Sequence, residues 1–273
     1  MWDFLFIKNL VTLYFIVKDN NMEQNAYTVG QENFNLPHDV VELPSKGLFY
    51  KTKKKSVKVG YLTASDENFI VNTFKGGSGN IVLTLLRNKV YEHDLRPEEL
   101  LEGDVEAILI FLRNTSFGPE YTISLSDPIT GKPFTTTIIL DELNIKRPNH
   151  QPDDNGLFIT KLPKSEATVK LRVLTYSELI ELDKQAEQYP QNITPPKITW
   201  RLNKQIVELN GSQDREQISK FIESMPIMDS KYIRNFLKEN QPSLDLTQTV
   251  QAPSGELVSF EIAFGVEFFR PFF

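Results

Sequence analysis

The segment "GDVEAILIFLRNTSFG" at residues 103–118 limits the possible folds of this chain more than any other segment. Its run from Ala107 to Leu112 is apolar on every face of a helix. A helix that is apolar all round has to be covered on all sides, so we expect it to lie in the centre of the core. The remaining elements must then pack around it.

Helices and extended segments alternate along the rest of the chain. Thr63 and Asp66 have the spacing of a capping box for a helix that precedes the central one. Thr175 and Glu178 repeat this spacing before a helix that we expect to end near Tyr189. The later elements are an extended stretch at 197–211, a helix that starts at Asp214, and a second helix capped by Asp229.

Two strand-turn-strand patterns stand out. The first, "EYTISLS" and "FTTTIIL", flanks a turn at Asp127–Lys132, and the second, "DLTQTVQ" and "LVSFEIAF", flanks a Pro-Ser-Gly turn. Both are rich in β-branched residues, as hairpins are. We therefore expect an α+β fold with a helical core and two β-hairpins, and the shared shape suggests two related units.

The turn "SDPITGKPF" at 126–134 places its proline, glycine and lysine as a zinc knuckle does, and "QAPSGEL" at 251–257 resembles it. The chain has no cysteine, which excludes disulfides, thiolate zinc sites and iron-sulfur clusters. Its three histidines, His38, His93 and His150, are far apart in polar surroundings, so we expect surface histidines and no metal site. The hairpins should therefore have a zinc-ribbon-like shape without metal.

The polar segment "RPNHQPDDNG" at 147–156 reads as a linker. It separates a predicted N-terminal α+β domain, 38–147, from a predicted C-terminal α+β domain, 157–273, with a helical pair and the terminal hairpin. Residues 1–37 are expected to be a leader or flexible N-terminus.

The first seventeen residues are apolar, but Asp3 and Lys8 interrupt them, and they are shorter than the roughly 20 residues of a membrane span. They also lack the basic start and small-residue cleavage site of a signal peptide. We therefore expect no membrane span and no export. Met22 offers an alternative start, which would make 1–21 an over-extended reading of the gene, and an amphipathic helix that docks on a partner is the other interpretation.

Catalytic and nucleic-acid-binding patterns are both weak. The sequence has no nucleophile elbow and no metal-ligand spacing, so we expect no enzyme, no cofactor and no small-molecule substrate. Thirty basic against thirty-six acidic residues give a net charge of −6, which argues against binding to a phosphate backbone. The lysine cluster at 51–55 is expected to be a solvated hairpin tip.

The C-terminal "FGVEFFRPFF" is unusually aromatic for a chain end. Phe264 and Phe268 could pack on their own domain, whereas aromatic residues and arginine dominate the hot spots of interfaces. We predict a partner interface formed by Phe268, Phe269, Arg270, Phe272 and Phe273.

Several phrases together resemble the baseplate hub proteins of contractile-tailed bacteriophages of the T-even type. They are "LPSKGLFY" (43–50), "VGYLTASDENF" (59–69), "GDVEAILIFLRNTSFGPEY" (103–121) with its hairpin, and the closing "FFRPFF". Similar sequences often carry cysteines of the C-P-x-C-G kind, and here Asp127 and Thr130 hold the first pair of positions, and Gln251 and Ser254 the second.

The resemblance implies a structural or assembly protein of a tail baseplate hub, in the virion or in the host cytoplasm during assembly. Its partners would be other baseplate or tail proteins, and it would have no catalytic residues. One alternative is a degenerate zinc-ribbon-like protein that binds nucleic acid or a polymerase-type complex through its hairpins and the lysines at 51–55. A hydrolase whose carboxylates meet only in the fold is another alternative.

Overall fold

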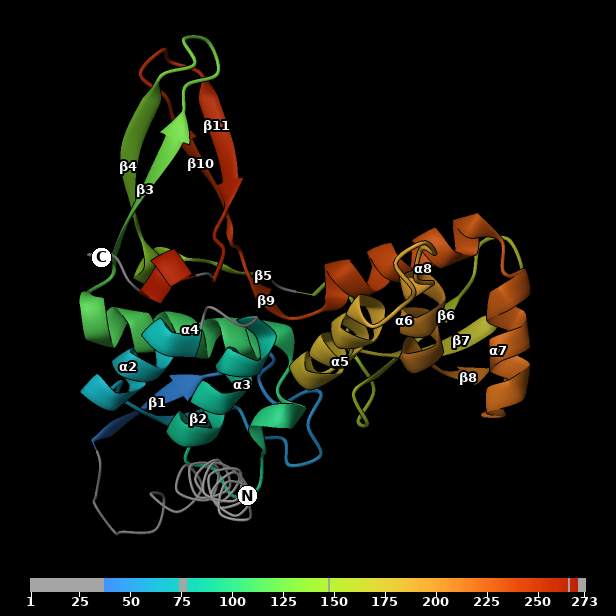
Figure 1. Cartoon of the computed structure of the whole chain (residues 1–273). Coiled ribbons are helices and arrows are strands. Elements are labelled where there is room, and N and C mark those ends of the chain that lie inside the picture. Colours follow the sequence, from blue (N-terminus) through green and yellow to red (C-terminus); the bar gives the residue numbers. More distant parts are fainter. Residues whose placement is uncertain (1–36, 74–77, 147, 265, 270–273) are drawn as a thin grey trace, which may run out of the picture. The chain divides into compact units, whose positions relative to one another are not determined.

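The computed structural model describes residues 37–73, 78–146, 148–264 and 266–269 (Figure 1). Contacts divide the chain into two units, Met1–Pro37 and His38–Phe273, and every helix and strand of the described residues belongs to the second. The predicted leader, apart from Pro37, lies outside the described residues. So does the apolar segment at its start.

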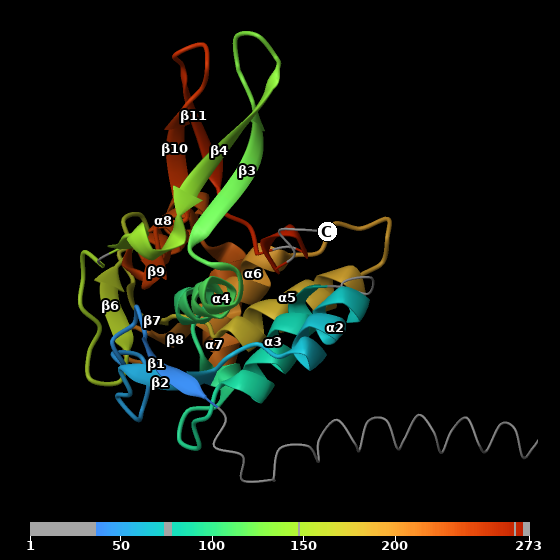
Figure 2. The same ribbon diagram turned by 90° about the vertical axis from the view of Figure 1, so that its left-hand side faces the viewer.

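The central helix is α4, Glu102–Phe117, and its Ile108 and Leu112 side chains are fully buried, as predicted. On one side of it lie two helices and a two-stranded antiparallel sheet, with the hairpins on the opposite side (Figures 1 and 2). The covering elements are α2 (Ala64–Thr73), α3 (Ser78–Lys89), β1 (His38–Glu42) and β2 (Ser56–Gly60). Short 3-10 helices, η2 (Pro97–Glu99) and η3 (Leu140–Glu142), connect this part of the chain.

Both predicted hairpins form. In the first, β3 (Glu120–Ser126) pairs antiparallel with β4 (Pro133–Ile139), and in the second, β10 (Thr247–Gln251) pairs with β11 (Leu257–Glu261). They stand side by side in both views of the ribbon (Figures 1 and 2). Together with the helices they confirm the α+β fold class.

A second group of elements surrounds a three-stranded antiparallel sheet in the order β6-β7-β8. The predicted capping box of Thr175 and Glu178 is present at the start of α5. The elements are β6 (Leu157–Lys161), β7 (Thr168–Arg172), α5 (Tyr176–Glu187), α6 (Lys197–Gln205), β8 (Ile206–Leu209), α7 (Arg215–Ser224) and α8 (Ile227–Asn240).

Two local predictions are corrected here. The stretch predicted to be extended at 197–211 begins with the helix α6, because Pro196 is its N-cap and the helix buries Leu202. The β-branched residues at its start had favoured a strand. Asp229 lies inside the first turn of α8, where its carboxylate instead accepts the backbone N–H groups of Lys164 and Ser165, both at 2.8 Å.

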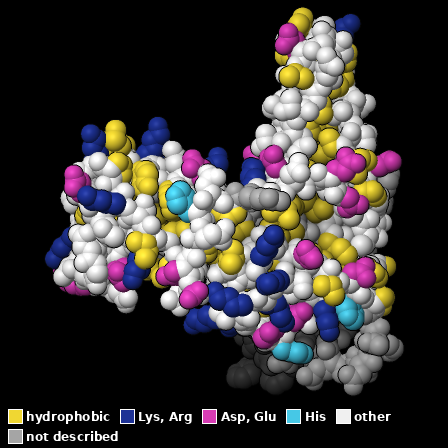
Figure 3. All heavy atoms as spheres, turned by 180° about the vertical axis from the view of Figure 1, so that it is seen from behind, with side chains coloured by type: hydrophobic (Ala, Val, Ile, Leu, Met, Phe, Trp, Pro, Cys, Tyr) yellow, Lys and Arg dark blue, Asp and Glu magenta, His cyan; other side chains and the backbone are white. Residues whose placement is uncertain are grey.

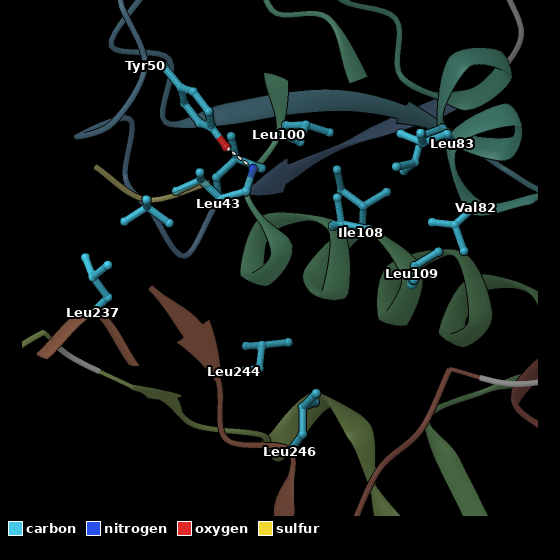
Figure 4. Close-up of a cluster of buried hydrophobic side chains, with 14 of the residues drawn as sticks. Leu43, Tyr50, Val82, Leu83, Leu100, Ile108, Leu109, Leu237, Leu244 and Leu246 are labelled. Carbon is cyan, nitrogen blue, oxygen red and sulfur yellow. Dashed lines mark hydrogen bonds between the residues drawn. The ribbon is translucent and has the colours of Figure 1, made fainter. Parts of the chain in front are cut away.

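The last part of the chain packs against elements from its first part. The short strands β5 (Ile145–Lys146) and β9 (Ser243–Leu244) pair antiparallel, and η4 (Val266–Phe269) follows the second hairpin. Figure 4 shows side chains of α3 on one side of α4, and Leu244 and Leu246 on the other. One cluster of buried apolar side chains extends from Val41 to Phe269. The division into domains 38–147 and 157–273 stays a prediction.

A buried hydrogen-bond network fixes the loop that contains "LPSKGLFY" on the start of α4. Asp104, which has no exposed surface, accepts the Ser45 backbone N–H at 2.9 Å and the hydroxyl of Tyr50. The Tyr50 hydroxyl in turn accepts the backbone N–H of Leu101 at 2.9 Å. Burial is the main reason why the pKa of Asp104 and the pKa of Tyr50 are both raised. Two phrases that are more than 50 residues apart in the sequence thus form one structural unit.

Among the described residues, none of the helices combines the length and the apolar character that crossing a membrane requires.

Candidate interaction site at the hairpin tips

The backbone of Asp127 closes the turn of the first hairpin. Its N–H donates to the carbonyl of Lys132 and its carbonyl accepts the N–H of Gly131, both at 2.9 Å. Gly131 has a φ of 66°, which few residues other than glycine adopt. The Asp127 Oδ1 atom accepts the N–H groups of Ile129 at 2.9 Å and Thr130 at 3.1 Å. One side chain therefore holds its own turn in place.

The second carboxylate oxygen of Asp127 connects the two hairpins. Oδ2 accepts the backbone N–H of Ser254 in the other turn at 2.9 Å, across 127 residues of sequence. The Asp127 side chain is buried, with 2% of the residue exposed. Burial alone would raise its pKa, but hydrogen bonds from the backbone of Thr130, Ile129 and Ser254 outweigh burial and lower the pKa. The ionised form of Asp127 is thus the one that joins the tips.

The remaining positions assigned to cysteines by the resemblance are used for local hydrogen bonds. Thr130 Oγ1 accepts the N–H of Lys132 at 3.4 Å, and Gln251 Nε2 donates to the Gly255 carbonyl at 3.1 Å. Within the described ranges, no three or more histidine, aspartate or glutamate side chains gather as a metal ion would require. One carboxylate, that of Asp127, connects the two turns.

An open cleft of about 290 Å³ lies between the two tips. Pro133, Phe134 and Pro253 form its apolar walls. Its polar lining is Asp127, Thr130, Lys132 and Ser254. Lys132 is the one basic residue of this lining, and both oxygens of Asp127 are already engaged in hydrogen bonds.

The same two hairpins carry large apolar side chains that are exposed. Ile129 in the first turn is 67% exposed, and Leu257 at the start of β11 is 70% exposed. Figure 3 shows hydrophobic side chains along the projecting hairpins and at their end. Exposed apolar side chains that gather in one patch mark contact surfaces. We define Ile129, Lys132 and Leu257 with the cleft walls Pro133, Phe134 and Pro253 as the tip surface.

The base of the hairpins contains part of the predicted C-terminal interface. Phe268 and Phe269 are buried, with 0% and 3% of their surface exposed, and their role in a partner interface stays a prediction. The guanidinium of buried Arg113 lies 5.2 Å from the Tyr121 ring centre and 5.7 Å from that of Phe268. Arg113 Nη2 also donates to the Glu120 carbonyl at 2.8 Å, which fixes the start of β3.

Three residues of that interface, Arg270, Phe272 and Phe273, lie outside the described residues. A contact of these three with a partner stays a prediction.

The lysine cluster at 51–55 is partly engaged in contacts within the chain. Lys54 pairs with Glu92 and Asp94, and Lys53 donates to the carbonyls of Leu48 at 3.2 Å and Asp154 at 2.5 Å. These bonds hold the loop at 51–55 against Leu48, Glu92, Asp94 and Asp154. They leave fewer lysine charges free than the sequence suggests.

A buried carboxyl group lies elsewhere, on α4. Burial, together with the nearby carboxylate of Glu102, raises the pKa of Glu106 to about 8. Raised carboxyl pKa values are common in catalytic sites. Glu106 is not among the residues that line the cleft, and its neighbours include Glu102, Lys146, Glu261 and the Leu244 backbone. Its setting is that of a helix packed against a strand.

Sequence reasoning missed the bond between the two tips. The only signal for it was the recurrence of the knuckle-like turn with an aspartate at a cysteine position. It also missed the tip surface, because the exposure of the Ile129 and Leu257 side chains depends on how the two hairpins are placed in the fold.

Comparison with known proteins gives one match. A family model described as T4 bacteriophage base plate protein matches residues 40–269, which is most of the chain. Neither curated proteins nor solved structures gave a match.

Proposed function

The chain belongs to the T4 bacteriophage base plate protein family, and on this premise we propose that it builds or assembles the central hub of a tail baseplate through protein contacts. Membership makes it a structural protein of a phage baseplate, located in the tail of the virion, with other tail proteins as partners. The hub position and the contact mechanism are the proposal.

The observation that supports a contact mechanism is the state of the polar groups at the tip surface. Asp127, the carboxylate of the cleft, accepts three backbone N–H groups and is buried. A general acid or base needs a free position from which to reach a substrate proton. Asp127 therefore stabilises a surface, which is what a non-enzymatic baseplate component requires.

The nucleic-acid alternative has less support. Lys53 and Lys54 are engaged with other parts of the chain, and the protein carries a net charge of −6. A binder of phosphate backbones needs several free cations along one surface.

The proposed function is tested by purifying the chain together with each baseplate and tail protein of its own phage genome. We expect a stable complex with at least one of them. Removal of residues 270–273 should weaken that complex by about tenfold or more, because arginine and phenylalanine side chains contribute strongly to interfaces. Binding is measured by interferometry, and helicity by circular dichroism.

The truncated chain should keep its helicity, since Phe268 and Phe269, which are buried in the core, remain. A complex of unchanged affinity would place the contact elsewhere on the protein. Failure of every tail protein to bind the full chain would contradict the proposed function itself.

A further inference from the structure

We propose that the tip surface is a docking site for another protein, one that inserts an apolar side chain between the hairpin tips and places a carboxylate beside Lys132. This inference rests on the proposed function, because it takes the partner to be another tail protein. It adds which part of this protein binds the partner, and which chemical groups of the partner that part recognises.

The tips are fixed in position before any partner binds. Asp127 holds its own turn through Ile129 and Thr130, and holds the other turn through Ser254. In the second turn the N–H of Ala252 donates to the Glu256 carbonyl at 2.8 Å, and the N–H of Gly255 to the Ala252 carbonyl at 2.9 Å. A surface that is already ordered loses little conformational entropy on binding.

The apolar part of the site has room for one side chain. Pro133, Phe134 and Pro253 line a cleft of about 290 Å³, and the same two hairpins carry the exposed side chains of Ile129 and Leu257. Central apolar pockets with rigid walls are where hot-spot residues of protein interfaces bind. An aromatic or branched aliphatic side chain of the partner has the size and the polarity to fill it.

The charge of the site selects the partner's chemistry. Lys132 is the one basic residue in the sequence of the two hairpins, 119–140 and 243–264. Asp127, the carboxylate that lines the cleft, has both oxygens engaged by backbone N–H groups. A carboxylate from a partner would complement this lysine and fix the orientation of the complex.

A single cation does not suit a nucleic acid. Phosphate backbones are bound by several lysines or arginines, each of which neutralises a phosphate. The hairpins carry exposed glutamates instead, Glu120 and Glu261 in the strands and Glu256 in the second turn, which would repel a polyanion. The observations therefore favour a protein with an isolated acidic residue over DNA or RNA.

The test measures affinities of the full-length chain for each purified tail protein of the same genome, and for duplex DNA. Lys132→Glu should weaken binding to one tail protein by about tenfold or more, and Lys132→Arg should stay close to wild type. Ile129→Ser and Leu257→Ser should each weaken binding by several-fold to about tenfold. Raising the salt concentration should weaken the wild type more than Lys132→Gln.

Two matched variants control for general changes of charge and of surface polarity. Lys55→Glu reverses an exposed lysine far from the hairpins in sequence, and Ile193→Ser replaces an isoleucine that is 58% exposed. Both should bind as the wild type does. Circular dichroism and thermal melting show that each variant is folded.

The outcomes separate the two proposals. If a tail protein binds the wild type and all tip variants equally, the docking site is overturned while the proposed function stands. If no tail protein binds the wild type, the proposed function is overturned, and the docking site with it. Binding of duplex DNA that Lys132→Glu abolishes would show that the site recognises phosphates, and would also overturn this proposal.

Discussion

At the scale of single residues, the two oxygens of Asp127 make different connections. Oδ1 holds the turn to which the residue belongs, and Oδ2 holds the turn of the other hairpin. A hydrogen bond to an ionised acceptor is stronger than one between neutral groups. The ionised carboxylate can therefore join two loops that a zinc-ribbon-like protein would join through metal.

Asp127→Asn should separate these two connections. The amide oxygen can replace Oδ1 and keep the bonds to Ile129 and Thr130, but the amide NH₂ group then faces the N–H of Ser254, donor against donor. We expect the Ser254 amide to exchange its hydrogen about tenfold faster or more, while those of Ile129 and Thr130 stay protected. Hydrogen exchange followed by NMR measures all three.

The same residue gives a pH dependence with a defined sign. Because the pKa of Asp127 is lowered in the fold, its stabilising contribution is present above the ordinary aspartate pKa of about 3.9 and is lost as the pH falls through the lower folded value. Protection of Ser254 in the wild type should fall in this acidic range. In Asp127→Asn it should be low at every pH, and equal protection in the two proteins would contradict the role of Oδ2.

At the scale of elements, the sequence predicted the helices and strands whose signals lie within a few adjacent residues. Thr63 with Asp66 and Thr175 with Glu178 start α2 and α5, because a capping box is read within four residues. The two hairpins also follow from alternation and turn residues. The helix α6 was missed since its start is β-branched, and its place is set by packing around Leu202.

The pairing of β5 with β9, the cleft and the exposure of Ile129 could not be predicted from the sequence. They depend on contacts between residues about 100 or more positions apart, for which a single sequence gives no signal. The same reason applies to Phe268 and Phe269, whose aromatic character is equally compatible with a core and with an interface.

Gly103 is the residue that lets α4 and β9 approach each other. A Cβ atom there would lie 2.2 Å from the Pro242 carbonyl oxygen and 2.6 Å from the Ser243 Cα, both backbone atoms with little freedom to move. Gly103→Ala would ordinarily favour a helix, but here we expect it to lower the free energy of unfolding by about 1–3 kcal/mol. Urea denaturation measures the change.

Hydrogen exchange gives Gly103→Ala a second readout. The amides of the β5-β9 pair, Ile145 with Leu244 and Lys146 with Ser243, should lose protection before those of β6 and β7 do. A variant as stable as the wild type, with this pair still protected, would show that the strand can shift without cost.

At the scale of the whole molecule, the described part of His38–Phe273 is held together by segments distant in sequence. Residues 243–269 pack on the first part through the β5-β9 pair, the Asp127–Ser254 bond, and the contact of Arg113 with Phe268. The apolar cluster that begins at Val41 includes side chains from α6, α7 and α8 and ends at Phe269. A shared core of this kind favours cooperative unfolding.

We therefore expect the two predicted domains to unfold in one transition. The chain has two tryptophans, so Trp2→Phe leaves Trp200 of α6 as the only one, with its ring 5.5 Å from that of Tyr189. Fluorescence of Trp200 then reports on 157–273, while far-ultraviolet circular dichroism also reports on α2, α3 and α4. The two urea transitions should have the same midpoint. Separate midpoints would show that 38–147 and 157–273 are stable independently, and that the shared cluster contributes little to either.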